Sequence, residues 1–236
     1  MQTPNQTFYA HPFSGAYWRD AARQLSDVRM LCLAALFIAL RVAIRQLMIP
    51  VGPNLNITAS FLVNSLGALL YGPVVAFFAA CASDTIGALL FPQGVYFFPF
   101  IFVEISSSVL FALFLWRARL STTRIFLSRF SVTLVSNLLL TPAIMVWYYK
   151  WLGEGKNYAF VTIPRVVKNL ALLPAEIVVL VLFFSALTPL LVRLGFLSPD
   201  QTKPILTKRH WLLLGVLFVV AVAVIILYYR FYLKKM

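Results

Sequence analysis

The sequence predicts an all-α integral membrane protein, a six-helix bundle followed by one extra C-terminal transmembrane helix. Three observations support this fold class. Of the 236 residues, 61% are hydrophobic and 11% are charged, whereas about a quarter of the residues in a soluble protein are charged. Apolar runs of about twenty residues, long enough to cross a hydrocarbon core about 30 Å thick, recur along the chain. Basic residues gather in short segments between alternate runs, as in multi-pass membrane proteins.

The N-terminal segment, residues 1–27, is polar and precedes the first apolar run. Its second half, GAYWRDAARQLSD at 15–27, predicts an interfacial helix, because Tyr17 and Trp18 are residue types that favour the headgroup level. We expect this segment to lie in the cytoplasm or on the inner membrane surface.

The membrane domain is predicted over residues 28–193. Gly72 and Pro73 interrupt its second apolar run, because proline lacks an amide hydrogen and glycine frees the backbone to turn. A cytoplasmic linker at 194–210 leads to a seventh span at 211–230. The six spans predicted in the membrane domain are 28–49, 59–71, 73–91, 98–117, 125–148 and 164–192.

The distribution of basic residues predicts a cytoplasmic N-terminus. With this orientation the loops at 50–58 and 92–97 face outward, and they contain no Lys or Arg. Cytoplasmic segments, in contrast, are enriched in Lys and Arg. The basic residues that this orientation assigns to the cytoplasmic side are Arg19, Arg23, Arg29, Arg117, Arg119, Arg124, Arg129, Arg193, Lys203, Lys208 and Arg209.

Charged and amide side chains inside the spans form the candidate binding site. The stretch IPRVVKNLALLPAEIVVLVL at 163–182 is the richest example, although a charge at the centre of a membrane helix costs about 2.5–3.5 kcal/mol on insertion. In the predicted orientation nearly all of these groups lie in the outer half of the membrane. This asymmetry indicates a pocket open to the outside rather than a continuous ion path. The candidate substrate-binding residues, with those of the loops above, are Arg41, Arg45, Asn54, Asp84, Tyr96, Glu104, Asn137, Trp147, Arg165, Lys168, Asn169 and Glu176.

The outer loops supply aromatic and amide groups that can cover a flat aromatic ligand by stacking and hydrogen bonding. These loops read VGPNLNI at 51–57, FPQGVYFFP at 91–99 and VWYYKWLGEGKNY at 146–158. A structural role for the charges stays open. The basic groups nearest the boundary can extend to the headgroups, and the acidic groups can pair with Arg41 or Asn137 to hold the bundle.

Small residues mark one face of the first span. In AALFIALRVA, Ala35, Ala39 and Ala43 recur at intervals of four and so fall on one side of a helix. Such a face lets another helix approach closely. The approaching helix belongs either to a partner protein or to the same bundle, and the spacing alone does not decide between them.

Catalytic and cofactor-binding patterns are missing from the sequence. It contains no GxSxG, HExxH or Walker A pattern, and its cysteines have no metal-ligand spacing. We therefore expect neither an enzyme nor a cofactor or metal site, and no nucleic-acid partner. Without a P-loop of its own, the chain needs another protein to drive uphill transport.

The motifs taken in order resemble one known family. The chain is similar to the substrate-binding S components of energy-coupling factor (ECF) transporters, and most closely to their folate group. The segments that carry this resemblance, over about residues 12 to 190, are PFSGAYWRDAARQL, AALFIALRVAIRQLMIPVGPNLNI, GALLYGPVVAFFAACASDTIGALLFPQGVYFFPF and IPRVVKNLALLPAEIVVL.

The resemblance implies a subunit of the bacterial plasma membrane that captures folate or a similar vitamin at its outer face. It also implies association with a transmembrane coupling subunit and two cytoplasmic ATPases, with Ala35, Ala39 and Ala43 as the docking face. The seventh span departs from the six-span pattern of the family. Three other functions stay open: an S component for another vitamin such as pantothenate, a self-sufficient small-solute transporter or channel, and a non-transporting membrane scaffold.

Overall fold

The computed structural model describes residues 8–9, 11–46, 48–52, 55–92, 95–153 and 163–201, together with 215, 216, 219, 222, 223 and 230. Most of the predicted seventh span at 211–230 therefore lies outside the described residues, as does about half of the predicted linker at 194–210.

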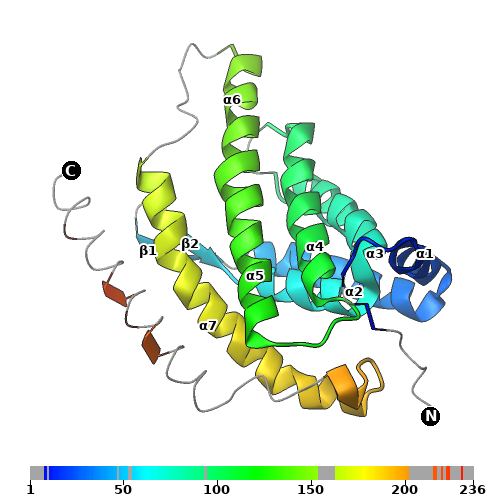
Figure 1. Ribbon diagram of the computed structural model, residues 1–236. Coiled ribbons are helices and arrows are strands. Elements are labelled where there is room, and N and C mark those ends of the chain that lie inside the picture. Colours follow the sequence, from blue (N-terminus) through cyan, green and yellow to red (C-terminus); the bar gives the residue numbers. More distant parts are fainter. Residues whose placement is uncertain are drawn as a thin grey trace.

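The described chain is mainly helical, as the sequence predicts. Short 3₁₀ turns lie at Gln24–Ser26, Phe98–Phe100 and Pro199–Gln201, and a π-helical segment, η3 (Thr133–Leu140), joins two helices into one continuous rod (Figure 1). The longer elements, in chain order, are α1 (Gly15–Arg23), α2 (Val28–Arg45), β1 (Met48–Gly52), β2 (Leu55–Thr58), α3 (Ser60–Leu90), α4 (Ile101–Leu115), α5 (Thr122–Val132), α6 (Thr141–Trp151) and α7 (Ile163–Arg193).

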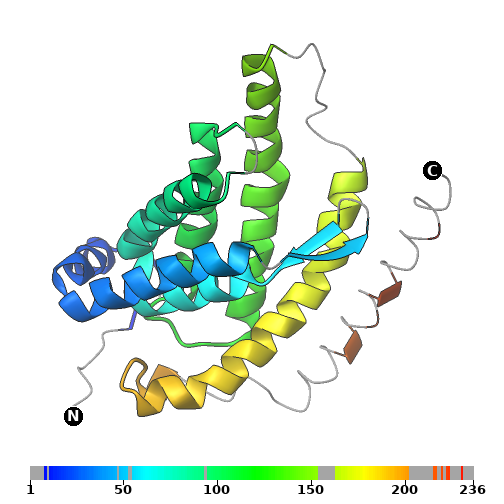
Figure 2. The same cartoon turned by 180° about the vertical axis from the view of Figure 1, so that it is seen from behind.

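The β1–β2 hairpin is a departure from the all-α prediction. The first span was predicted to run to residue 49, but α2 ends at Arg45, and Met48 already pairs with Thr58 in the antiparallel hairpin. Figure 2 shows α2 leading into this hairpin. Short strands that contain a proline give little signal in a sequence, so the segment at 50–58 was expected to be only a loop.

Several helices are suited to a bilayer by length and composition. Among the described residues, those long and apolar enough to cross a membrane are Ser60–Leu90, Phe98–Leu115, Thr122–Trp151 and Leu172–Arg193. α2 has a similar length of 18 residues, but it contains Arg29, Arg41 and Arg45.

The predicted break between the second and third spans is confirmed at Gly72. This residue has φ 78° and ψ 179° inside α3, a conformation that only glycine adopts readily. A β-carbon at this position would lie 2.6 Å from the Trp116 ring. Glycine is therefore needed here both for the backbone turn and for the close approach of the indole.

The hydrophobic core lies where α2, α3, α4 and α7 meet. Phe37 of α2, Tyr71 of α3, Phe111 of α4 and Phe184 of α7 are all buried and belong to one cluster. α3 packs most extensively against α4 and α2, so its two halves form the centre of the bundle.

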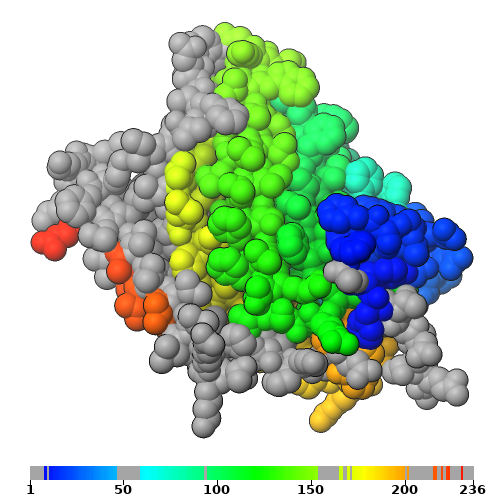
Figure 3. Space-filling model, in the orientation of Figure 1, coloured from blue at the N-terminus to red at the C-terminus, as the bar shows by residue number. Residues whose placement is uncertain are grey.

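The α1 helix covers one flank of this bundle, as Figure 3 shows in dark blue. The structure confirms a helix here but not the position expected for Tyr17. Tyr17 is 1% exposed, its ring lies 4.9 Å from that of Trp116, and its hydroxyl donates to the Ala112 carbonyl at 3.4 Å. The Tyr17 ring therefore packs inside the bundle and not at the headgroup level. Trp18, in contrast, is 43% exposed.

An ionic cluster ties α1 to the segment after α4. Arg117 donates to the Asp20 carboxylate at 2.7 Å, and the Tyr9 hydroxyl donates to the same carboxylate at 2.7 Å. The hydrogen bond from Tyr9 and the adjacent Arg117 guanidinium lower the pKa of Asp20. The carboxylate therefore stays ionised and anchors the N-terminal helix.

The basic segments converge at one end of the bundle. Arg29 at the start of α2 donates to the Leu194 carbonyl at 3.2 Å and lies 4.2 Å from the centre of the Phe196 ring. The Leu120 amide donates to the Gln201 carbonyl at 3.0 Å. The start of α2, the α4–α5 connection and the end of α7 thus share this end, which we call the basic end.

A Gly72→Ala variant should be destabilised. The added methyl group forces a side chain into a glycine-only conformation, at about 1–3 kcal/mol, and meets the Trp116 ring. The matched control is Gly15→Ala, because a β-carbon there meets no atom within 4 Å. Thermal unfolding in detergent should show a lower Tm for Gly72→Ala alone, and equal Tm values in both variants would contradict the role given to Gly72.

Candidate functional site

A cavity of about 360 Å³ lies inside the helical bundle. Its lining comes from α2, α3, α4, the α5–η3 helix and α7, and it is rich in charged and amide groups. The predicted site residues that line it are Arg41, Arg45, Asp84, Glu104, Asn137, Asn169 and Glu176. Side chains that are far apart in the sequence therefore meet around one hollow.

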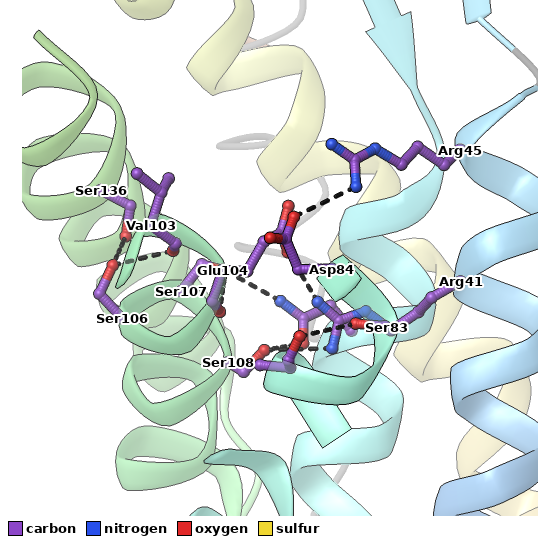
Figure 4. Close-up of polar contacts among 12 residues, drawn as sticks. Arg41, Arg45, Ser83, Asp84, Val103, Glu104, Ser106, Ser107, Ser108 and Ser136 are labelled. Carbon is purple, nitrogen blue, oxygen red and sulfur yellow. Dashed lines mark hydrogen bonds and ion pairs between the residues drawn. The ribbon is translucent and has the colours of Figure 1, made fainter. Parts of the chain in front are cut away.

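Arg41 joins α2 to α4 at this cavity. Its guanidinium contacts the Glu104 carboxylate at 2.7 Å and donates to the Ser108 hydroxyl at 3.3 Å. Ser108 in turn donates to the Asn64 side-chain oxygen at 2.7 Å, and Asn64 donates to Ser107 at 3.2 Å. Figure 4 shows these contacts from α2 and α4 converging. The polar groups of this wall hold one another in place.

Arg45 joins α2 to α3 one helical turn further along. Its guanidinium contacts the Asp84 carboxylate at 3.3 Å, and the Tyr96 hydroxyl donates to the other Asp84 oxygen at 3.4 Å (Figure 4 shows the arginine and the carboxylate). The Arg45 side chain is 41% exposed, whereas that of Asp84 is 5% exposed. Arg45 is thus the more accessible member of the pair.

Arg129 is a cavity residue that the sequence did not predict. It was assigned to the cytoplasmic side, but it is 6% exposed, lines the cavity and contacts the Glu176 carboxylate at 2.6 Å. Its guanidinium also lies 4.7 Å from the centre of the Phe61 ring. The fifth helix begins at Thr122 rather than 125, and Arg129 therefore lies about 10 Å along it.

Asn64, Ser83 and Ser107 also line the cavity and were absent from the predicted set. Serine is common in membrane helices that only pack against one another, so these serines carried no signal. Asn64 is an amide inside a predicted span, and this position marks it as a polar group of the same kind as Asn137.

A second cavity, of about 340 Å³, shares Arg45 and Asp84 with the first and extends to aromatic residues. Tyr96, Phe97 and Tyr148 line it. The Phe97 ring lies 5.4 Å from the ring of Trp147, which itself lines neither cavity. The segment at 91–99 thus meets the end of α6, because residues 146–151, which were expected in an outer loop, are helical. We call this region the aromatic end.

The remaining predicted residues are less well placed or lie outside the described residues. Arg165 is half-buried and lines neither cavity, and its backbone carbonyl accepts a hydrogen bond from the Asn169 side chain at 2.9 Å. Asn54 and the side chain of Lys168 lie outside the described residues.

The alanine face of α2 is directed away from the bundle. Ala35, Ala39 and Ala43 are all exposed, whereas Ala34 and Phe37 on the opposite side are buried. Internal packing, the alternative that the spacing left open, therefore does not account for these alanines in the described chain.

The cavity is equipped to bind a polar molecule. Its arginines and carboxylates are matched in pairs, and the amides of Asn137 and Asn169 add donors and acceptors. Among the described residues no three His, Cys, Asp or Glu side chains are grouped to hold a metal ion. Its volume falls within the range of small-molecule sites.

Comparison with known proteins identifies similar chains. Residues 26–189 match the family model described as ECF-type riboflavin transporter, S component. The folate transporter FolT of Leuconostoc mesenteroides is 30% identical over 154 residues, which cover 64% of this chain and 82% of that protein. The folate transporter FolT of Streptococcus mutans is 27% identical over 164 residues, which cover 64% of this chain and 88% of that protein.

A solved structure has a similar fold. The crystal structure of FolT bound with folic acid superposes with a TM-score of 0.56 at 25% identity, over 75% of this chain and 98% of that chain. Nearly all of that chain is thus matched, and 75% of the present chain takes part in the match.

Removing one member of the Arg129–Glu176 pair should destabilise the protein. An Arg129→Met variant leaves the Glu176 carboxylate, whose side chain is 19% exposed, without its partner, at up to about 3–5 kcal/mol. The double variant Arg129→Met/Glu176→Met should recover most of that loss, because it leaves no unpaired charge. Thermal unfolding in detergent measures both, and a double variant no more stable than the single one would contradict this account.

Proposed function

The chain belongs to the S components of ECF-type transporters, and on this premise we propose that it captures folate or a related carboxylated vitamin from outside the cell. S components are substrate-binding transport subunits and not enzymes, and this chain is a multi-pass membrane protein. The described helices, with α3 counted as two spans, fit a six-span bundle, and the seventh span at 211–230 stays a prediction from the sequence.

The mixed-charge cavity is the observation that carries this proposal. A folate molecule combines a flat heterocycle that donates and accepts hydrogen bonds with two carboxylates. The amides of Asn137 and Asn169 and the carboxylate of Glu176 suit the heterocycle, and the guanidinium of Arg45 suits a carboxylate. The aromatic end beside the cavity suits stacking against the rings.

The aromatic end faces outward in this proposal, and the basic end faces the cytoplasm. The convergence of Arg29, Arg117 and the segment after α7 at one end supports this orientation, since cytoplasmic segments are rich in basic residues. Asn169 lines the cavity, and Arg165 lies one turn earlier on the same helix. On this basis we propose that Arg165 lies at the mouth of the cavity, and Lys168 is proposed from the sequence alone.

A coupling subunit and two ATPases supply the energy for transport in this proposal. The exposed alanines at 35, 39 and 43 support docking through α2, because small side chains allow a partner helix to come close. Leu36 and Leu40 extend the same exposed surface and add apolar area for the partner.

Riboflavin is a second candidate ligand, because the matching family model is described by that vitamin. The relatives matched over most of their length are named for folate, and the cavity offers guanidinium groups that riboflavin, without a carboxylate, does not need. Folate is therefore the first choice, and pantothenate, which has one carboxylate, stays an alternative.

Isothermal titration of the purified protein with folic acid, riboflavin and pantothenate tests the ligand assignment. Folic acid should bind most tightly. Arg45→Gln should weaken its binding by about 1.5–3 kcal/mol, which is roughly ten- to a hundredfold in Kd, because a charged hydrogen bond is lost. The matched control is Arg193→Gln, an exposed arginine at the basic end, which should leave Kd unchanged. Tighter binding of riboflavin than of folic acid would refute the assignment.

An Ala39→Trp variant should separate capture from transport. The bulky ring holds a docking helix away, while the cavity is lined by other side chains, so folate binding should persist and uptake should fall. Val179→Trp is the matched control, because Val179 is 46% exposed and belongs to α7 rather than to α2, which carries the alanine face. Normal uptake and normal co-purification of the coupling subunit with Ala39→Trp would rule out docking through this face.

A further inference from the structure

The long helix from Thr122 to Trp151 changes its winding in the middle. α5 and α6 are α-helical, but the eight residues of η3, Thr133–Leu140, are π-helical, with hydrogen bonds to the residue five positions earlier. Such segments are rare, and they widen the helix by roughly one residue per turn. They often occur at functional sites, and this one borders the cavity through Asn137.

Ser136 and Thr141 hold this wider winding. The Thr141 amide donates to the Ser136 carbonyl, five residues earlier, and the Thr141 hydroxyl donates to the same carbonyl at 2.7 Å. Across the bundle, the hydroxyls of Ser106 of α4 and Ser136 lie 2.7 Å apart, as Figure 4 shows. Ser136 is fully buried, so α4 fixes the rotation of the π segment at this point.

Pro142 adds a second reason for the wider winding. Proline has no amide hydrogen, and in a regular α-helix its ring clashes with the carbonyl four residues earlier, which here belongs to Leu138. A wider turn moves that carbonyl aside. Pro142 is buried, so the ring has no room to shift away from the helix instead.

The winding decides which side chains face the ligand. Arg129, Val132 and Asn137 all line the cavity, although Val132 and Asn137 are five residues apart. On a regular α-helix a five-residue step turns by about 140°, which would direct Asn137 away from the side that Val132 faces. The π segment removes most of this difference.

The change in rotation caused by the π segment also affects the aromatic end. Tyr148, which lines the second cavity, is eleven residues after Asn137. The first three of these steps, to Leu140, belong to the π segment, and the other eight are α-helical. At about 80° per π-helical step and about 100° per α-helical step, the Tyr148 side chain comes back to within about 40° of Asn137. The π segment therefore aligns the outer part of the rod, with Asn137 and Tyr148, to the inner part, with Arg129.

We propose that Ser106, Thr141 and Pro142 are positioning residues that hold the π winding and thereby direct Asn137 and Tyr148 toward the captured vitamin. This inference rests on the proposed function, because it takes the cavity as the vitamin site. Ser106, Thr141 and Pro142 line neither cavity, so their influence on the vitamin passes through the rotation of the helix.

Thiol labelling tests the winding without any ligand. In a background with Cys32→Ser and Cys81→Ser, Asn137→Cys should react readily with a small water-soluble methanethiosulfonate. Adding Thr141→Val and Pro142→Ala should slow this reaction several-fold, because the helix regains α winding and turns position 137 away. Asn169→Cys is the matched control: it lines the same cavity from α7, and its reaction rate should not change.

A double-mutant cycle that measures the Kd for folic acid tests whether the π winding acts on the vitamin through Asn137. Thr141→Val/Pro142→Ala should raise Kd by about five- to tenfold in the wild-type chain, but by much less in an Asn137→Ala chain, where the group to be directed is already missing. Thr141→Ser keeps the hydroxyl and should bind like wild type. If the double variant is poorly produced, Thr141→Val alone should show the same pattern with smaller changes.

The outcomes separate this inference from the proposed function. An unchanged labelling rate at position 137 would overturn the winding role, whatever the ligand is. Equal fold-losses of affinity in the wild-type and the Asn137→Ala chains would also overturn it, because a general loss of stability acts alike in both. A wild-type chain that binds no folic acid would refute the ligand assignment, while the labelling rates would still decide the winding.

Discussion

Arginine side chains inside a membrane bundle need a carboxylate partner, because an unpaired charge in a low-dielectric interior is too costly. Arg41, Arg45 and Arg129 meet this requirement through Glu104, Asp84 and Glu176. Each pair joins two different helices: α2 to α4, α2 to α3, and α5 to α7. The pairs therefore fix the spacing of the helices, and the cavity lies where the pairs converge.

The same pairing explains how a charged cavity can remain inside the bundle until a ligand arrives. Each guanidinium is already bound to a carboxylate, and the cavity carries no large excess of either charge. A ligand with its own carboxylates and hydrogen-bond donors can take over part of these contacts, so that the charges stay paired throughout. This exchange suits the capture role proposed above.

The two ends of the bundle differ in chemistry, and this difference follows from the same requirement. The aromatic end, around Phe97, Trp147 and Tyr148, offers rings without formal charge beside the cavity. At the basic end Arg29 and Arg117 bind carbonyl groups and the Asp20 carboxylate near the surface. Charges are thus either paired around the cavity or placed at an end where headgroups and water can solvate them.

The sequence by itself determined the features that depend on local patterns: the apolar runs, the break at Gly72, the alanines as one side of a helix, and most of the polar groups that line the cavity. The tertiary structure alone decided which charges form pairs, and it showed that Arg129 and Tyr17 are buried. It also decided that β1 and β2 pair as a hairpin and that a π segment aligns Asn137 with Arg129. These features arise from contacts between distant elements, such as Arg129 with Glu176 or Ser106 with Ser136. Residue type and spacing along the chain contain no record of such contacts, because the same helix can rotate or extend by one turn with little change in its local energy.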